Sequence, residues 1–211
     1  MMSYYNKNNL FPKLTYGDLS EVQALLKSGV NIDEHKNERG ETALYNTLFT
    51  GYMDRAALLL KHNAIPNIQD NSGQTILHLL VADNSIDKMK CLFENTTNID
   101  LKIKSFSGHF PLYTSMLNEN IDAMDLLLKK GADINSKDSF GGSALHGAMC
   151  GGKLKAAELL LKHGADVNSK NSSGASALHG AIYNNQLKAA ELLLKHGADV
   201  NAKDNYGNTI L

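Results

Sequence analysis

A regular row of histidines is the first feature of this sequence that could carry chemistry. His78, His146 and His179 each follow a Thr-x-Leu or Ser-x-Leu element. Imidazole nitrogens are common zinc ligands, but one zinc ion needs all of its ligands at roughly 2 Å. Residues one helical unit apart lie about 10 Å from each other, so these side chains cannot share an ion. We expect each imidazole to bond the hydroxyl that caps its own helix and the backbone of a neighbouring turn.

A second set of histidines stands at the ends of leucine-rich segments. His62, His163 and His196 each follow a lysine there. A base at this place favours the negative end of a helix dipole. The pattern therefore predicts helix-capping residues and not metal ligands.

The other reactive groups lack the partners that catalysis requires. Cys91 and Cys150 are 59 residues apart with no C-x-x-C pattern, which favours two reduced, small apolar side chains. Asp122 and Asp125 have helical spacing on a predicted solvated face, unlike an acid–base pair. No G-x-S-x-G, H-E-x-x-H or complete G-x-x-x-x-G-K-[ST] motif occurs. We expect no catalytic site, no metal and no cofactor in this chain.

The bulk composition restricts the class of partner. The net charge of the 211 residues is −1, from 21 Lys and Arg against 22 Asp and Glu, so no overall field attracts a nucleic acid or an anionic membrane. No apolar run approaches the roughly 20 residues that span a bilayer, and the start MMSYYNKNNLF lacks the regions of a secretory signal. We expect a cytoplasmic monomer whose partner is a protein, not nucleic acid, a membrane or a small-molecule substrate.

An internal repeat determines how these residues are positioned. The segment LKAAELLLKHGADVN occurs at residues 154–168 and again, unchanged, at 187–201. Glycines that close a polar tip recur at Gly40, Gly73, Gly108, Gly141, Gly174 and Gly207, in steps of 33, 35, 33, 33 and 33 residues. A fixed period of this length is typical of stacked-repeat proteins. The longer step indicates a two-residue insertion near Ile103 and Lys104.

Each period has the same order of elements: a polar tip, a short helix, a tight turn, a longer apolar helix and a loop. In the period 138–170 we expect the first helix from about Ser143 to Cys150 and the second from about Lys153 to His163. The second helix is apolar nearly all round, so it must be covered on more than one side. One unit cannot bury these leucines alone, and stability must come from stacked neighbours.

These elements resemble the ankyrin repeat family, whose unit begins D-x-x-G-x-T-P-L-H-x-A-A and ends L-L-x-x-G-A-D-V-N-A. The first pattern is matched at residues 42–45, 75–78, 110–113, 143–146, 176–179 and 209–211, and the second at 131–135, 164–168 and 197–201. The resemblance implies an all-α ankyrin-repeat solenoid of stacked helix-turn-helix units with short β-turn or hairpin tips. We expect a flexible N-terminus at 1–9 and a single domain over 10–211, with units at about 10–36, 37–69, 70–104, 105–137, 138–170 and 171–203 and a partial unit at 204–211.

The chain departs from the family pattern at three places. Residues 95–98 read Asn-Thr-Thr-Asn where Gly-Ala-Asp is expected, so we expect a local irregularity and a hinge around residues 95–105. The first unit contains Pro12 within its expected first helix and resembles an N-terminal cap. The chain stops at Leu211 in the opening turn of a seventh unit, which leaves open whether the natural protein continues or this end frays.

The resemblance also implies a function: a non-enzymatic adaptor or scaffold that binds a partner protein through a concave face made of the tips and first helices. Carried over position by position, the binding residues are Arg39, Glu41, Phe49, Phe106, His109, Leu117, Phe140, Tyr183 and Tyr206. Aromatic side chains at polar tips suit a protein interface. A composition rich in Asn, Lys and Ile resembles the ankyrin arrays of intracellular bacteria and large DNA viruses, so we also expect a host-directed interaction protein, placed in the host cytoplasm if it is secreted.

Three alternatives stay open at this point. The chain could be the targeting segment of a larger enzyme whose catalytic domain lies beyond Leu211. Nucleic-acid binding would require a basic stripe, whereas the predicted face carries acids and amides. Asn135, Asn168 and Asn201 are similar to family asparagines that are hydroxylated in animal cells, and the simpler interpretation is that each ties its loop by side-chain to backbone hydrogen bonds.

Overall fold

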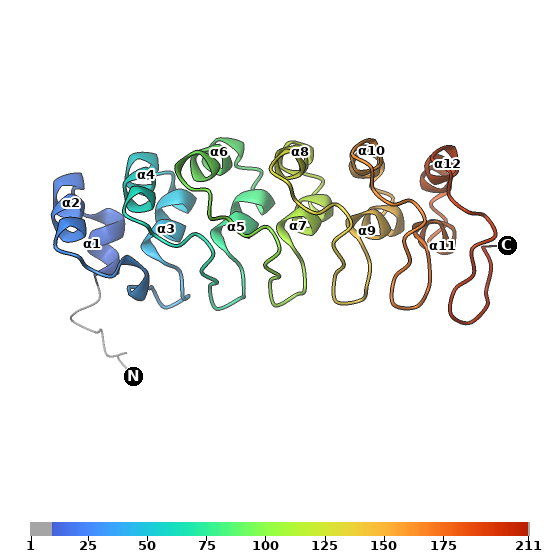
Figure 1. The fold of residues 1–211 in the computed structure, drawn as a ribbon, viewed down its shortest axis with the longest axis horizontal. Coiled ribbons are helices and arrows are strands. Elements are labelled where there is room, and N and C mark those ends of the chain that lie inside the picture. Colours follow the sequence, from blue (N-terminus) through green and yellow to red (C-terminus); the bar gives the residue numbers. More distant parts are fainter. Residues whose placement is uncertain (1–9, 211) are drawn as a thin grey trace. The chain divides into compact units, whose positions relative to one another are not determined.

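A computed structural model describes residues 10–210, and its helices follow one another in pairs (Figure 1). The first helices of the pairs are α1 (Phe11–Tyr16), α3 (Ala43–Thr50), α5 (Ile76–Ala82), α7 (Pro111–Leu117), α9 (Ala144–Cys150) and α11 (Ala177–Tyr183). The second helices are α2 (Leu19–Lys27), α4 (Met53–Lys61), α6 (Ile86–Asn95), α8 (Ile121–Lys129), α10 (Leu154–Lys162) and α12 (Leu187–Lys195), and η1 (Ile32–Glu34) is a short 3-10 helix. The predicted all-α repeat fold is confirmed. The predicted flexible segment 1–9 and Leu211 lie outside the described residues.

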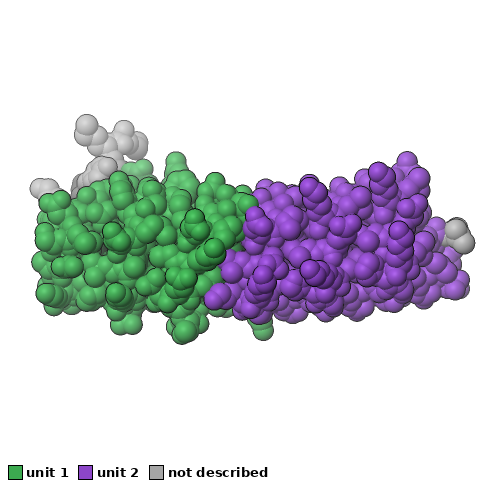
Figure 2. Space-filling model, turned by 90° about the horizontal axis from the view of Figure 1, so that it is seen from above, with its two compact units in different colours: residues 1–106 green, residues 107–211 purple. Residues whose placement is uncertain are grey.

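The chain divides into two compact units, residues 1–106 and 107–211 (Figure 2). In unit 1 the first helices α1, α3 and α5 pack side by side, and α2, α4 and α6 form a second row. In unit 2 the first row is α7, α9 and α11, and the second is α8, α10 and α12. The boundary follows the insertion at Ile103 and Lys104. The single domain, its unit boundaries and the hinge stay predictions.

The first helices begin where a polar side chain can cap them. The hydroxyl of Thr42 accepts a hydrogen bond from the backbone amide of Tyr45 at 3.2 Å. This satisfies one of the amides that a helix start leaves without a partner. The same position in other units carries Thr75, Ser143 and Ser176, each in a capping box with a histidine.

Two prolines stand in the first turns of helices. Pro12 lies in the first turn of α1, and Pro111 is the first residue of α7. A missing N–H costs no helical hydrogen bond there, and the fixed backbone angle suits a helix start. Pro12 therefore stands in the first turn of the first helix and does not interrupt it.

One leucine position of the second helices supplies much of the core. Its members are Leu26, Leu59, Leu92, Leu127, Leu160 and Leu193, and all six are buried. Burying one leucine side chain contributes roughly 1.5–3 kcal/mol. Because neighbouring helices supply the cover, each unit depends on the next, as the repeat pattern predicts.

The third unit ends differently from its neighbours. After α8 and α10 the chain turns at Gly131 and Gly164, with φ of 87° and 85°. After α6, which is 10 residues long, Thr96 takes extended angles with φ of −153°. Asn95 instead donates its side-chain amide to the carbonyl of Cys91 at 2.8 Å. The loss of the glycine thus produces the local irregularity expected from the sequence.

Five of the tips are tight polar turns, each held by the side chain of its first residue. Oδ1 of Asp138 accepts hydrogen bonds from the amides of Phe140 and Gly142, both at 2.8 Å. The same pair of bonds forms at Asn37, Asp70, Asn171 and Asp204. Isolated antiparallel bridges close two tips, Lys36 with Thr42 and Lys170 with Ser176. The tips are therefore rigid before any partner arrives.

Candidate functional site

One position at or next to the end of each first helix is exposed in successive repeats. Its members, one period apart, are Tyr16, Phe49, Ala82, Leu117, Cys150 and Tyr183. The side chain of Phe49 is 48% exposed and that of Tyr183 is 91% exposed. Large apolar side chains left in solvent at equivalent places are typical of a binding surface. Three of them, Phe49, Leu117 and Tyr183, are among the predicted site residues.

Tyr16 belongs to this position but was missed by sequence reasoning. It is exposed, and its hydroxyl donates to Oδ1 of Asn46 at 3.0 Å. The available signal is its place 33 residues before Phe49. The first unit lacks a tip glycine, which hides that register in the sequence.

The predicted tip aromatics are also exposed. Phe106, Phe140 and Tyr206 are 77%, 78% and 83% exposed. Phe106 lies against Gly73 of the preceding tip, where a Cβ added to the glycine would come within 2.7 Å of the Phe106 nitrogen. Phe140 and Tyr206 each stand directly before their own tip glycine. The rings are therefore exposed at two kinds of place: Phe106 rests on the preceding tip, and Phe140 and Tyr206 lie at the turn of their own tip.

The two charged residues of unit 1 that were predicted to bind, Glu41 and Arg39, differ in exposure and in hydrogen bonding. The half-buried carboxylate of Glu41 accepts hydrogen bonds from the side-chain amides of Asn37 at 2.5 Å and Asn46 at 3.4 Å. Arg39 is exposed, and its carbonyl accepts from the amide of Asn71 in the next tip at 2.9 Å. The Glu41 side chain thus takes part in hydrogen bonds within its own repeat, whereas Arg39 is exposed on its tip.

His109 lies beside an aromatic ring of its own unit. Its imidazole stacks on Tyr113 with ring centroids 4.7 Å apart and an angle of 16° between the planes. Burial, and then the nearby carboxylate of Asp138, raise the pKa of the Tyr113 phenol. The phenol therefore stays protonated at neutral pH, and the stacked pair is a half-buried part of the unit 2 surface.

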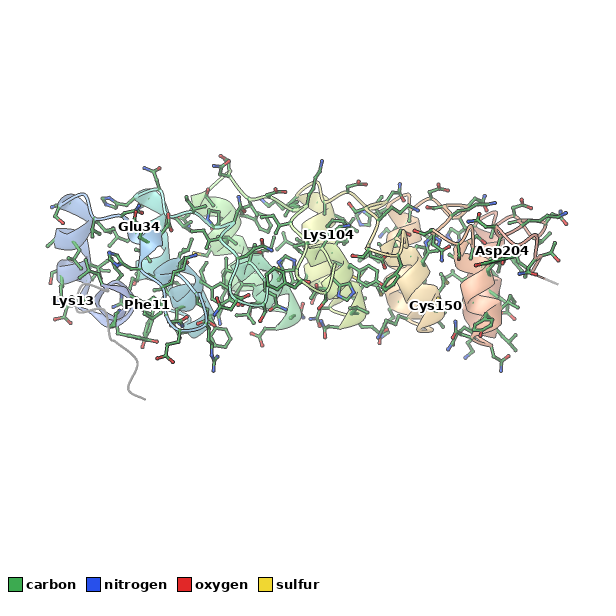
Figure 3. The ribbon with its side chains drawn as sticks, turned by 90° about the horizontal axis from the view of Figure 1, so that it is seen from below. Phe11, Lys13, Glu34, Lys104, Cys150 and Asp204 are labelled. Carbon is green, nitrogen blue, oxygen red and sulfur yellow. The ribbon has the colours of Figure 1, made fainter. Side chains whose placement is uncertain are left out.

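A groove in unit 2 brings two of the predicted residues together. It has a volume of about 600 Å³ and lies along α11 and the last tip. Tyr183 and Tyr206 line it together with Cys150, Ile182 and Asp204. Cys150 and Asp204 are labelled in Figure 3. The remaining predicted residues divide between the units, with Arg39, Glu41, Phe49 and Phe106 in unit 1 and His109, Leu117 and Phe140 in unit 2.

Charged side chains are distributed unevenly over the tips and first-helix ends. In unit 1 these positions include Glu38, Arg39, Glu41 and Asp83. The equivalent positions of unit 2 carry Ser, Asn, Gly, Ala, Phe and Tyr, with His109 as the titratable exception. The side chains at these positions therefore differ between the two units, since unit 1 carries charged groups there and unit 2 carries apolar, hydroxyl and amide groups.

The row of histidines has the structural role that the sequence predicts. Nδ1 of His146 accepts from the amide of Ser143 at 3.2 Å, and Nε2 lies 3.3 Å from the carbonyl of Ala175 in the next tip. Burial lowers the pKa of His146, so the ring is neutral at pH 7. His78 and His179 make the same bond to their caps. In residues 10–210 no group of three or more His, Cys, Asp or Glu side chains is placed to hold a metal ion.

The groups that could act as nucleophiles or acids sit in unfavourable environments. Burial raises the pKa of the thiols of Cys91 and Cys150, so both stay protonated at neutral pH. Asp125 bonds Lys129 at 2.5 Å and His163 at 3.2 Å, and these contacts lower the pKa of its carboxyl group. An ionised carboxylate held by two bases is a surface ion pair and a poor general acid.

A partial phosphate-binding pattern proves to be helical. Residues 147–153 read G-A-M-C-G-G-K, followed by Leu154 where the motif requires Ser or Thr. Gly147 lies inside α9, and its missing Cβ leaves room for Met116 and Tyr113 of α7. A phosphate cradle needs the free amides of a loop, which a helix interior does not offer.

No helix in the described part of the chain has the length and apolar character to cross a membrane.

The loop asparagines join successive repeats by hydrogen bonds. Oδ1 of Asn135 accepts from the amide of Asp166 at 3.0 Å, and Oδ1 of Asn168 accepts from the amide of Asp199 at 2.8 Å. Asn67 bonds Asp100 in the same way at 2.9 Å. The predicted structural role of Asn135 and Asn168 is confirmed, and their hydroxylation stays a prediction.

Known proteins share this architecture. A family model described as ankyrin repeats (3 copies) matches residues 13–105 and 112–204. The crystal structure of the ankyrin repeat domain of Bcl-3, from the IkappaB protein family, is similar with a TM-score of 0.88 and 30% identity, covering 97% of this chain and 92% of that one.

Two of the curated relatives come from a bacterium and a virus. A putative ankyrin repeat protein of Rickettsia felis is 85% identical over 138 residues, which are 65% of this chain and 45% of that protein. A putative ankyrin repeat protein of Fowlpox virus is 32% identical over 128 residues, which are 61% of this chain and 17% of its own length. The chain spans less than half the length of these relatives.

Proposed function

Because the chain belongs to the ankyrin repeat family, whose repeats are generally modules of protein–protein interaction, we propose that it is a non-enzymatic adaptor or scaffold that binds a partner protein. The partner contacts the tips and the exposed ends of the first helices. The observation that carries this proposal is the exposure of aromatic rings on polar turns, at 77%, 78% and 83% for Phe106, Phe140 and Tyr206. Buried aromatic anchors dominate the binding energy of protein interfaces.

Rigid complementarity supplies the affinity. Five tips are held by hydrogen bonds to the side chain of their first residue, which is Asn37, Asp70, Asp138, Asn171 or Asp204. The buried leucines of the second helices stabilise the helix rows that carry these tips. Binding to a preformed surface loses little conformational entropy. The partner therefore meets Phe140 and Tyr206 on turns whose backbone is already ordered.

The same proposal extends to the setting of the interaction. The protein acts as a monomer in the cytoplasm, or in a host cytoplasm as a host-directed interaction protein. The support for the host-directed role is a composition rich in Asn, Lys and Ile, together with the 85% identity to a putative ankyrin repeat protein of Rickettsia felis. The near balance of charge, at −1 overall, supports a protein partner over nucleic acid.

The test is capture of a partner from the native cell with the wild-type chain and with a Phe106→Ala, Phe140→Ala double variant. We expect the double variant to lose the captured protein, because each ring is an exposed anchor whose removal leaves the fold intact. The captured protein is identified by mass spectrometry, and its affinity is then measured with purified components.

Matched controls separate binding from stability. Leu19→Ala with Val200→Ala removes two exposed apolar side chains away from the tips, and capture should be unchanged. The melting temperature of the aromatic double variant should equal that of the wild type. Unchanged capture by the aromatic double variant would refute the proposal.

A further inference from the structure

A polar pocket in unit 1 lies at the ends of two neighbouring second helices, α4 and α6 (Figure 1). Leu60 and residues 63–66 line one side of it, and residues 94–98 line the other. Its volume of about 650 Å³ is in the range of ligand-binding pockets. We propose that this pocket binds an arginine side chain from an extended segment of a protein. The inference goes beyond the proposed function, because the pocket shares no residue with the tips or the first helices.

An acidic residue breaks the charge pattern of the second helices at this pocket. Two positions after their buried leucine, α4, α8, α10 and α12 carry Lys61, Lys129, Lys162 and Lys195. In α6 the same position is Glu94. The negative end of the helix dipole favours a lysine in the last turn and disfavours a carboxylate. Glu94 therefore weakens its own helix end, as residues that serve binding often do, and a cation beside it offsets that cost.

The carboxylate of Glu94 is available to a ligand. None of the ion pairs formed by residues 10–210 includes it. Lys90 stands one turn earlier on α6, but its ammonium lies 3.8 Å from Asp87. The basic residues at the end of α4, Lys61 and His62, are exposed and do not line the pocket. The pocket thus presents one negative charge that the protein itself leaves without a cation.

Neutral oxygen atoms near this carboxylate favour arginine over lysine. The exposed residues Asn63, Thr97 and Asn98 line the pocket, and their amide and hydroxyl oxygens can accept hydrogen bonds. A guanidinium carries five N–H donors in a planar fork, whereas a lysine ammonium is a compact and strongly hydrated charge with three. The fork can therefore bond the carboxylate and neutral oxygens at the same time.

The apolar part of the lining suits the stem of an arginine. Leu60, Ala64 and Pro66 are buried, and Ile65 beside them is 50% exposed. The methylene groups of an arginine lie on apolar surface while its charged end stays with polar groups. Side chains that flank the arginine in a peptide can also cover Ile65. This favours a protein segment over a free cation as the occupant.

The two sides of the pocket are joined before a ligand binds. Oδ1 of Asn67 accepts a hydrogen bond from the amide of Asp100 at 2.9 Å, and Nδ2 of Asn67 donates to the carbonyl of Asn98 at 2.8 Å. Oγ1 of Thr96 accepts from the amide of Asn98 at 3.1 Å. Because these bonds already order both loops, binding loses little conformational entropy.

The experiment is an NMR titration of the ¹⁵N-labelled whole chain with the capped peptide Ala-Leu-Arg-Leu-Ala. We expect saturable shifts of the backbone amides of residues 63–65 and 94–98, with a dissociation constant of about 1 mM or below. Citrulline in place of arginine keeps the shape and removes the charge, and it should weaken binding about fivefold or more, as should Glu94→Gln. Glu158→Gln removes an exposed carboxylate of α10 and is the matched control, with binding unchanged.

A second variant separates binding from folding. Glu94→Lys restores the residue type found at this position in the other second helices. We expect it to abolish the peptide-induced shifts and to keep the melting temperature at or above that of the wild type. A lower melting temperature would show that Glu94 stabilises the fold and would overturn the argument from the helix end.

Four results would overturn the inference: no saturable shifts at the pocket, equal binding of the citrulline peptide, equal binding by Glu94→Gln, or a lysine peptide that binds as tightly as the arginine peptide. Equal affinity for free L-arginine would reject a protein segment as the occupant. The Phe106→Ala, Phe140→Ala double variant should bind the arginine peptide as the wild type does. Failure of this site and failure of the proposed function are therefore distinguishable.

Discussion

At the scale of single residues, a buried histidine links one helix start to the next tip. His146 receives the amide of Ser143 at Nδ1, and its Nε2 faces the carbonyl of Ala175. The contact at Nδ1 requires the neutral ring, because a protonated Nδ1 cannot accept a hydrogen bond, whereas Nε2 can donate to the Ala175 carbonyl in either form. Burial lowers the pKa of His146 below 6.5, its ordinary value.

Stability should therefore fall as the pH falls. The unfolded chain binds a proton at His146 more readily than the folded chain does, so the contribution of the neutral ring is complete above pH 6.5 and is lost as the pH falls through the lowered folded pKa. We expect His146→Gln to cost about 1 kcal/mol at pH 7.5 and to reduce the loss of stability between pH 7.5 and pH 5. Urea unfolding at both pH values measures this. His62→Gln, at an exposed helix end, is the control, and equal pH slopes for the wild type and His146→Gln would contradict the mechanism.

At the scale of elements, identical helices should differ in what their leucines contribute. Leu161 and Leu194 share one sequence context but are 8% and 46% exposed. We expect Leu161→Ala to cost about 2–3 kcal/mol of unfolding free energy and Leu194→Ala less than about 1 kcal/mol, since the cost follows burial and cavity size. Urea denaturation of the two variants provides the comparison. Equal losses would show that sequence and not the neighbouring helix determines the contribution.

Alanine substitutions at two glycines should distinguish the cost of backbone strain from the cost of a steric clash between neighbouring tips. Gly73 and Gly131 both have left-handed angles, with φ of 72° and 87°. A Cβ on Gly131 meets nothing within 4 Å, whereas one on Gly73 would lie 2.7 Å from the backbone nitrogen of Phe106. We expect Gly131→Ala to cost about 1 kcal/mol from strain alone and Gly73→Ala about 2 kcal/mol or more. Thermal and urea melts test the order, and a smaller cost at Gly73 would contradict the close approach of the tips.

At the scale of the whole molecule, the balance of charge determines how binding responds to salt. The net charge is −1, and the unit 2 positions equivalent to Glu38, Arg39, Glu41 and Asp83 carry no Asp, Glu, Lys or Arg. We expect the affinity for the captured partner to change less than about threefold between roughly 50 and 200 mM NaCl. A nucleic-acid contact would weaken by a factor on the order of a thousand over that range. Isothermal titration at both salt concentrations decides between them.

The repeat could be predicted from the sequence because its signals are local. The expected first helix from about Ser143 to Cys150 is observed as Ala144–Cys150, with Ser143 as its cap. The expected second helix from about Lys153 to His163 is observed as Leu154–Lys162, flanked by those two residues. Caps, glycine breaks and leucine spacing act within a few residues, so the order and length of the elements follow from the chain itself.

The state of each surface residue could not be read in this way. Glu41 is one of the predicted binding residues, yet its carboxylate accepts hydrogen bonds from Asn37 and Asn46. Tyr16 was not predicted, although it occupies the position equivalent to Phe49 and bonds Asn46. Leu161 and Leu194 have identical local sequences and opposite exposures. The hydrogen bond from Tyr16 to Asn46 and the different exposures of Leu161 and Leu194 depend on residues about 30 positions away that only stacking brings into contact, whereas Glu41 is held by residues four and five positions away. The sequence alone therefore determined the repeat, and the tertiary structure decided which of its residues are free to bind.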